Sequence, residues 1–189
     1  MADFLTAYNI VHGHEGGYAN VPGDKGGETY MGIARVSNPR WGGWPIIDAV
    51  KQTRALRRGD FISDVALTTL VQGFYRATWL QMRGDLLKNQ AVANFYYDFY
   101  TNSGGATKVV QRLLVNSFAQ PLTIDGAPGP ATAAAINAVD QVALHAALKA
   151  ARTAYVKALV TNDPRNAQFL PTWLARINSF PTLEKKTLG

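Results

Sequence analysis

The chain has 189 residues, of which 47% are apolar and 17% charged, and its formal net charge is +6. This length and apolar content suit one domain, or two small domains that share a core. No apolar run approaches the roughly 18 residues that a membrane span needs, so we expect no stable membrane insertion. The absence of cysteine excludes disulfide bonds and thiolate chemistry.

The first predicted element is an amphipathic helix near the N-terminus. Phe4, Tyr8 and Val11 follow helical spacing and share one apolar stripe, which Glu15 continues. Gly16–Gly17 should then end the helix, because glycine readily takes the left-handed conformation of a helix end. A carboxyl on a buried stripe, at the negative end of a helix dipole, should hold its proton more tightly than a free glutamate. Glu15 is therefore a candidate general acid for glycosidic cleavage.

A polar, glycine-rich turn with Asp24 and Thr29 follows directly, and Thr29–Ile33 is predicted to be a short strand. Taken alone, Asp24 suits an ordinary turn, and Glu15 suits a solvated helix end. Together, a helix-end acid that faces a hairpin with a carboxylate and a hydroxyl is a lysozyme-like arrangement.

The rest of the chain is predicted to be helical with short breaks. Ser63 is a possible cap of the third helix in chain order, and Pro130 suits the first turn of another. The predicted helices after the hairpin are Ala49–Arg58, Ser63–Met82, Gln90–Thr101, Lys108–Phe118, Ala131–Val139, Val142–Val160 and Ala167–Ile177. We predict a mainly α, lysozyme-like, two-lobed helical fold with a small β-hairpin beside the active-site cleft. The predicted lobes are residues 1–92, which would be catalytic, and residues 93–189, packed as one unit with the first.

Several motifs resemble glycoside hydrolase family 108, the bacterial and phage N-acetylmuramidases. The signature segment combines a Glu-Gly-Gly-Tyr core with a Gly-Gly-x-Thr-x-x-Gly-Ile continuation, and the later motifs follow in the family's order. The segments that carry the resemblance are His14–Tyr18, Gly26–Ile33, Phe74–Trp79, Asp98–Gly104, Gln111–Leu114, Asp125–Thr132 and Phe169–Arg176. The segments from Gln111 onward resemble the peptidoglycan-binding region that is paired with this family.

The resemblance implies cleavage of the β-1,4 bond between N-acetylmuramic acid and N-acetylglucosamine, without a cofactor or metal. It implies that Glu15, Asp24 and Thr29 are catalytic. Val21 departs from the family pattern, where an Asp usually precedes the proline of the first turn. Tyr30 stands where the family often has a smaller residue. Neither departure touches the three catalytic candidates.

Aromatic and polar side chains near these motifs are candidates for substrate binding, because pyranose faces stack on aromatic rings. Asp98 and Asn102 lie four residues apart on one helix face and should form a polar pair; a purely structural hydrogen bond is the alternative. Core positions are the alternative for the aromatic candidates, and we expect Trp79, Tyr96 and Phe99 to be buried. The substrate-binding candidates are Tyr18, Tyr30, Trp41, Trp44, Asp98 and Asn102.

Positive charge gathers in the second half of the chain. Residues 1–98 carry 10 Lys/Arg and 9 Asp/Glu, whereas residues 99–189 carry 9 and 4. Such a surplus suits an anionic polymer, either peptidoglycan or nucleic acid. Lys149, Arg152 and Lys157 are spread along one predicted helix and form no dense stripe, so we expect peptidoglycan and no nucleic acid. The cluster at Arg54–Arg58 suits a solvated helix face.

Other reaction classes find less support in the sequence. His12 and His14 point to different helix faces and no His-Glu-x-x-His pattern is present, which argues against a zinc enzyme. No Gly-x-Ser-x-Gly elbow is present for a serine hydrolase. A lytic transglycosylase at the same site and a non-catalytic peptidoglycan-binding protein stay open as alternatives. We expect a monomer made in the host cytoplasm without a signal peptide. As in phage endolysins, it would reach the cell wall through a holin.

Overall fold

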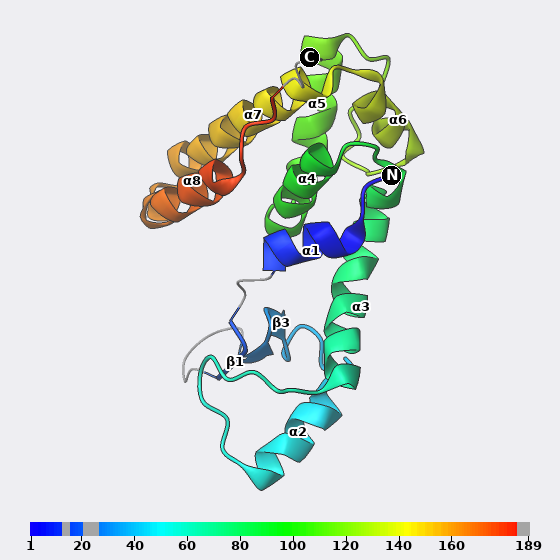
Figure 1. Ribbon diagram of the computed structural model, residues 1–189. Helices are drawn as coiled ribbons and strands as arrows, with labels where there is room; N and C mark the ends of the chain where they lie inside the picture. Colours follow the sequence, from blue (N-terminus) through cyan, green and yellow to red (C-terminus); the bar gives the residue numbers. More distant parts are fainter. Residues whose placement is uncertain (13–15, 21–26, 185–189) are drawn as a thin grey trace. The chain divides into compact units, whose positions relative to one another are not determined.

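The computed structural model describes residues 1–12, 16–20 and 27–184. The described residues contain eight α-helices, two short 3₁₀ helices and one small antiparallel sheet (Figure 1). The α-helices are α1 (Phe4–His12), α2 (Trp44–Thr53), α3 (Val65–Gln81), α4 (Gln90–Asn102), α5 (Ala106–Phe118), α6 (Pro130–Ala138), α7 (Gln141–Asn162) and α8 (Leu170–Ser179). The strands are β1 (Tyr18–Asn20), β2 (Glu28–Tyr30) and β3 (Ile33–Ala34), and the 3₁₀ helices are η1 (Gly84–Leu86) and η2 (Pro164–Phe169).

This is the mainly α, lysozyme-like fold that the sequence predicts. None of the helices in the described ranges is long and apolar enough to cross a membrane. The chain divides into two compact units. One unit comprises Tyr8–Ala77, and the other joins Met1–Ala7 to Thr78–Gly189. Both divisions fall inside helices, α1 and α3, whereas we expected one division near residue 92.

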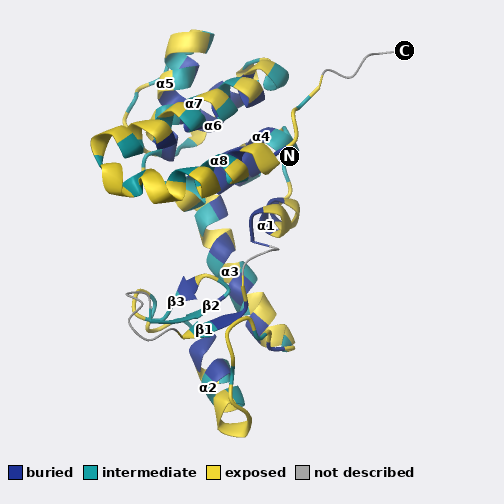
Figure 2. Cartoon of the chain, turned by 90° about the vertical axis from the view of Figure 1, so that its left-hand side faces the viewer, coloured by how far each residue is buried: buried dark blue, intermediate teal, exposed yellow. Residues whose placement is uncertain are grey.

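The sheet of the Tyr8–Ala77 unit has the order β1-β2-β3. Tyr18 pairs with Tyr30, and Tyr30 pairs with Ile33. These three side chains are buried and lie on one face of the sheet. Figure 2 colours the chain by burial. Because side chains alternate along a strand, Thr29 belongs to the opposite face, where its partners across the sheet are Ala19 and Ala34.

A two-residue turn at Met31–Gly32 joins β2 to β3. The predicted single strand over Thr29–Ile33 is therefore wrong at this point. Both residues have positive φ, 48° for Met31 and 79° for Gly32, which is the pattern of a tight hairpin turn. A methionine is unusual there, and its backbone is fixed at both ends. Its N–H donates to the Gly17 carbonyl at 3.1 Å, and its carbonyl accepts from the Tyr75 hydroxyl at 2.6 Å.

Backbone bonds also hold β1 against the segment before α3. The Tyr18 N–H donates to the Asp60 carbonyl, and the Gly59 N–H donates to the Tyr18 carbonyl, each at 2.8 Å. A Cβ on Gly17 would collide with the Asp60 carbonyl group, whereas a Cβ on Gly16 would meet nothing within 4 Å. Gly17 has no positive φ. The prediction that it ends a helix in the left-handed conformation is therefore wrong, and Gly17 is needed for close backbone approach. The end of the predicted helix at residues 13–15 lies outside the described residues.

Helix α2 lies nearer the N-terminus than the predicted Ala49–Arg58. It begins at Trp44, because Pro45 suits the first turn of a helix. It ends before Arg54, whose backbone is extended. In α3 the predicted cap was Ser63, but the cap is Asp64, whose carboxylate accepts from the Leu67 N–H at 2.7 Å.

The core of the other unit is built around α4, in which Val92–Phe99 are all buried. Helix α4 packs against α5 and α7, and α7 also packs against α8, which lies beside it in Figure 1. The expected burial of Trp79, Tyr96 and Phe99 is confirmed, with exposed fractions of 2%, 1% and 0%. The predicted last helix, Ala167–Ile177, is instead η2 followed by α8.

Gly17→Ala should lower the free energy of unfolding by about 1–3 kcal/mol, because the added methyl group forces β1 away from Asp60. Gly16→Ala is the matched control and should leave stability nearly unchanged, since open space surrounds that position. Urea unfolding of the two variants measures the difference. Equal losses would mean that the approach of Gly17 to Asp60 does not constrain the hairpin.

Candidate active site

The described part of the predicted site is the hairpin that carries Thr29. Glu15 and Asp24 lie outside the described residues. Thr29 is the middle residue of β2 and is partly exposed. Its cross-strand neighbours are alanines, Ala19 and Ala34. Small neighbours leave room around the hydroxyl on this face of the sheet.

Glu28, the residue before Thr29, is held by three donors. Its carboxylate accepts from the Tyr18 hydroxyl at 2.9 Å, from Lys51 Nζ at 2.7 Å and from Arg35 Nη1 at 2.5 Å. Burial alone would raise its pKa, but hydrogen bonds from Lys51, Arg35 and Tyr18 outweigh burial and lower the pKa below the ordinary 4.5. Glu28 is therefore ionised at neutral pH and unsuited to donate a proton.

Asp48 extends this arrangement onto α2. Arg35 forms a two-pronged pair with Asp48, with N···O distances of 2.8 and 2.5 Å. The hydrogen bond from Arg35 is the main cause of a lowered pKa at Asp48, and the bond to Glu28 is the main cause of a raised pKa at Lys51. We call Glu28, Arg35, Asp48 and Lys51 the hairpin clamp. It fastens β2 to α2.

We did not predict the hairpin clamp from the sequence. Its members are ordinary charged residues, and Arg35 and Asp48 are separated by a loop and the first turn of α2. The available signal was weak. Asp48 and Lys51 have the i,i+3 spacing of a helical ion pair.

The remaining described carboxylates of the Tyr8–Ala77 unit also have structural partners. Asp60 accepts from Arg54 at 3.1 Å and from the Arg57 backbone N–H at 2.9 Å. The backbone bond from Arg57 is the main reason for the lowered pKa of Asp60. Asp64 caps α3.

Most of the predicted substrate-binding aromatics are buried. Tyr18, Tyr30 and Trp44 are 5%, 4% and 2% exposed. The Tyr30 hydroxyl accepts from the Ile62 N–H, and the Trp44 indole donates to the Asn38 carbonyl. These rings stabilise the unit and offer little free surface to a sugar.

Trp41 is the partly exposed member of the predicted tryptophan pair. It contacts the edge of Trp44, with ring centroids 5.1 Å apart. Its indole N–H points to the Leu70 carbonyl at 3.4 Å. Among the four aromatic candidates it keeps the most surface for a ligand, so its role in substrate binding stays a prediction.

Asp98 and Asn102 lie in the other unit, on α4. The Asn102 amide donates to the Asp98 backbone carbonyl at 2.8 Å and approaches its carboxylate at 3.4 Å. The Asp98 carboxylate, 1% exposed, pairs with Arg152 of α7 at 2.5 Å and with Arg176 of α8 at 2.7 Å. We call Asp98, Arg152 and Arg176 the buried triad, after the buried carboxylate at its centre; the Arg176 side chain is 33% exposed. Its geometry indicates a structural function that joins three helices.

Three cations on α7 were part of the expectation that peptidoglycan binds the basic half of the chain. Two of them instead make structural contacts, as Asp98 does. Arg152 is 4% exposed, and its guanidinium packs 5.0 Å from the Phe99 ring centroid. Lys149 donates to the Phe180 carbonyl at 2.5 Å. A helix facing the core cannot present all of its cations, so Lys157 is the exposed member of the three.

In the described ranges, no three His, Asp or Glu side chains gather in a way that could hold a metal ion. His12 and His145 are 3% and 1% exposed. The His12 ring stacks on Tyr75 with centroids 3.7 Å apart. Burial lowers the pKa of His145, and the nearby Lys149 lowers it further. These are core histidines.

Comparison with known proteins divides the chain into two matched regions. Residues 8–104 match the sequence model of the family described as glycosyl hydrolase 108. Residues 105–178 match the family described as a predicted peptidoglycan domain. No curated protein matches the chain. Among solved structures, Brucella abortus SagA is similar, with a TM-score of 0.56, 24% identity and coverage of 94% of each chain. At that identity the likeness shows the fold alone.

Asp98→Asn should destabilise the protein by about 3–5 kcal/mol, because it removes the carboxylate charge that pairs with the buried Arg152. Arg165→Ala is the control, since it removes the exposed pair with Asp163 and should change stability little. Urea midpoints of the two variants test this. Similar small losses in both would mean that the buried triad does not stabilise α4 against α7 and α8.

Glu28→Gln should reduce stability at pH 7, and the difference from the native protein should disappear in acid. The folded pKa of Glu28 is below the ordinary 4.5, so the unfolded chain binds more protons in that window. The clamp's contribution is present above pH 4.5 and is lost as the pH falls through the folded pKa. Melting temperatures between pH 7 and pH 3 measure the effect, with Glu184→Gln as a control at an exposed site. A pH-independent difference would contradict an ionised Glu28.

Proposed function

Because this chain belongs to the glycosyl hydrolase 108 family, we propose that it is an N-acetylmuramidase with Glu15 as its general acid. The family and the predicted peptidoglycan domain make the chain a peptidoglycan hydrolase. The proposal adds the bond and the mechanism. The bond would be the β-1,4 linkage between N-acetylmuramic acid and N-acetylglucosamine.

The structural contacts of the described carboxylates in the Tyr8–Ala77 unit support the proposal that the general acid lies elsewhere in the unit. The Tyr8–Ala77 unit has six carboxylates in its sequence. Four of them are bound by cations or cap a helix, as described above: Glu28, Asp48, Asp60 and Asp64. A general acid must be protonated when the substrate arrives, and the lowered pKa values of Glu28, Asp48 and Asp60 exclude that state at neutral pH. These four carboxylates are therefore poor candidates for the general acid, which is consistent with Glu15, the acid of the family motif.

We assign the two carboxylates different roles. Glu15, which we predict from its spacing to continue the apolar stripe of Tyr8 and Val11, would be protonated and donate to the glycosidic oxygen. Asp24, in a polar glycine-rich segment, would be ionised. With the Thr29 hydroxyl it would orient the attacking water, or it would stabilise positive charge on the sugar ring. The partly exposed position of Thr29 between two alanines supports its part in this scheme.

Glu15→Gln should lower the rate of peptidoglycan cleavage by about 10²–10⁴-fold, because the amide has no proton to donate. Mass spectrometry of fragments from purified peptidoglycan measures both rate and product. Reducing N-acetylmuramic acid ends support a muramidase. Anhydro-muramic ends would instead assign a lytic transglycosylase, and no fragments a binding protein.

Glu28→Gln is the matched variant for the alternative acid on the hairpin. Assayed well below its melting temperature, it should retain turnover. Loss of turnover in a folded Glu28→Gln protein, together with activity in Glu15→Gln, would move the acid to Glu28. Asp24→Asn should also be severe and Thr29→Ala milder. Lysis of permeabilised cells by the native protein tests the bacteriolytic use that we expect of an endolysin.

A further inference from the structure

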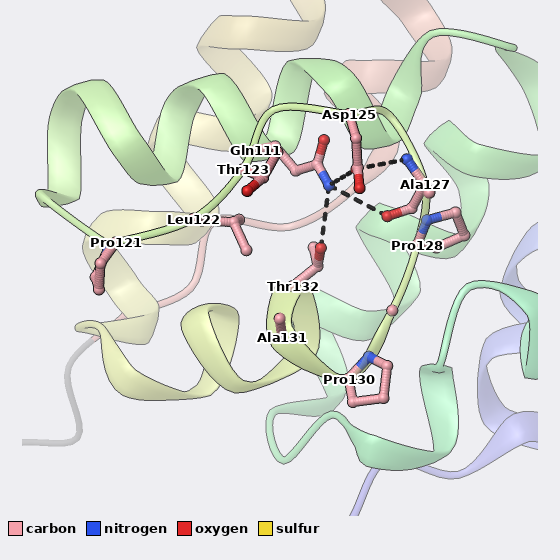
Figure 3. Close-up of a pocket in the computed structure, with 11 residues that line it drawn as sticks. Gln111, Pro121, Leu122, Thr123, Asp125, Ala127, Pro128, Pro130, Ala131 and Thr132 are labelled. Atoms are coloured by element: carbon pink, nitrogen blue, oxygen red, sulfur yellow. Dashed lines mark hydrogen bonds between the residues drawn. The ribbon is translucent and has the colours of Figure 1, made fainter.

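A cavity of about 350 Å³ lies in the region that matches the predicted peptidoglycan domain. Its walls come from α5, from the turn-rich segment after α5, and from the first turn of α6 (Figure 3). This volume is in the range of pockets that hold small ligands. No step of the proposed hydrolysis uses it.

Gln111 makes the cavity a fixed feature of the fold. Its side chain, 1% exposed, extends from α5 into the turn (Figure 3). The amide nitrogen donates to the Asp125 carboxylate at 2.8 Å, the Ala127 carbonyl at 3.1 Å and the Thr132 hydroxyl at 3.2 Å. The amide oxygen accepts from the Gly126 N–H at 2.7 Å. The wall therefore has little freedom to collapse.

Asp125 is the one charged side chain among the described residues that line the cavity. Its Oδ1 atom accepts from Gln111 and from the Ala127 N–H. Apart from its own backbone N–H, no other residue in the described ranges donates a hydrogen bond to this carboxylate. The residue itself is exposed at the rim, so an anionic oxygen with a fixed position is open to a ligand.

The other lining groups define what else a ligand meets. Leu122, Pro128 and Pro130 give apolar walls, and no aromatic ring lines the cavity in the described residues. A pyranose ring therefore has no stacking surface there. The first turn of α6 has no side-chain cap, and its partial positive charge suits a carboxylate. The cavity therefore suits a ligand that combines an ammonium group, a carboxylate and apolar parts. This combination is typical of a peptide rather than a glycan.

We propose that this cavity binds the peptide stem of peptidoglycan and that Asp125 pairs with the free side-chain amine of the stem. The inference rests on the proposed function, since it takes peptidoglycan as the substrate. It assigns recognition of the peptide to one region, whereas cleavage of the glycan belongs to the other. An uncross-linked stem carries such an amine and also free carboxylates.

Binding of the stem tripeptide Ala–γ-D-Glu–Lys to the full chain tests the proposal, with backbone amide NMR as the readout. The peptide should shift the signals of Gly126 and Ala127. Acetylation of the lysine amine should weaken binding at least about tenfold, which corresponds to about 1.4 kcal/mol. Asp125→Asn should cause a similar loss, because asparagine can still accept from Gln111 while the charge is removed.

Asp140→Asn is the control with the same change of charge in the same region. Asp140 caps α7, a position where asparagine serves equally well, so peptide binding should not change. The proposal is overturned if Asp125→Asn binds like the native protein. It is also overturned if peptide-free chitotetraose shifts the Gly126 and Ala127 signals while the peptide does not.

Failure of this inference can be separated from failure of the proposed function. Peptide binding is measured without turnover, and it can be measured equally on Glu15→Gln. Release of reducing muramic ends is measured separately on purified glycan strands from which the peptides have been removed. An active enzyme with no peptide binding overturns the inference alone. Peptide binding without muramic ends overturns the muramidase alone.

Discussion

One carboxylate held between two cations is the interaction on which each unit of this protein depends. In the Tyr8–Ala77 unit it is Glu28, between Arg35 and Lys51. In the other unit it is Asp98, between Arg152 and Arg176. The first fastens a three-stranded sheet to α2, because strands of two or three residues cannot hold their position by pairing alone. The second joins α4 to α7 and α8, where a lone buried charge would be strongly destabilising.

This use of charge changes how the basic composition should be interpreted. The net charge of +6 suggests a surface that attracts anionic polymers over a distance. However, Arg152 is buried, Lys149 binds a backbone carbonyl, and Arg35 and Lys51 neutralise the hairpin clamp. These four cations are held in structural contacts, so the surplus that attracts an anionic polymer lies in other side chains, such as the exposed Lys157.

The sequence predicted what depends on local pattern. The apolar run of α4, the burial of Trp79 and the start of α6 at Pro130 all follow from neighbours within a few residues. It failed where the deciding partner is distant. Nothing near Gly17 indicates that Asp60 will pack against it, and nothing near Met31 indicates that Tyr75 will hold its carbonyl. Trp44 was a candidate for substrate binding because aromatic rings stack on pyranose faces, yet its ring is covered by Arg35 and its indole N–H is bound by the distant Asn38 carbonyl.

The hairpin clamp also bears on the proposed catalytic acid, although its residues take no part in the proposed reaction. The sequence motif points to Glu15 as the general acid, but another carboxyl nearby could serve if its pKa kept it protonated at neutral pH. The hairpin clamp removes the strongest competitor, since three donors keep Glu28 ionised. The same ion pairs also hold the strand that carries Thr29. With Glu28 ionised and paired with two cations, the hairpin offers no protonated carboxyl at this position, in agreement with the proposal of Glu15. In this way the electrostatics that stabilise the hairpin also exclude Glu28 as a proton donor at neutral pH.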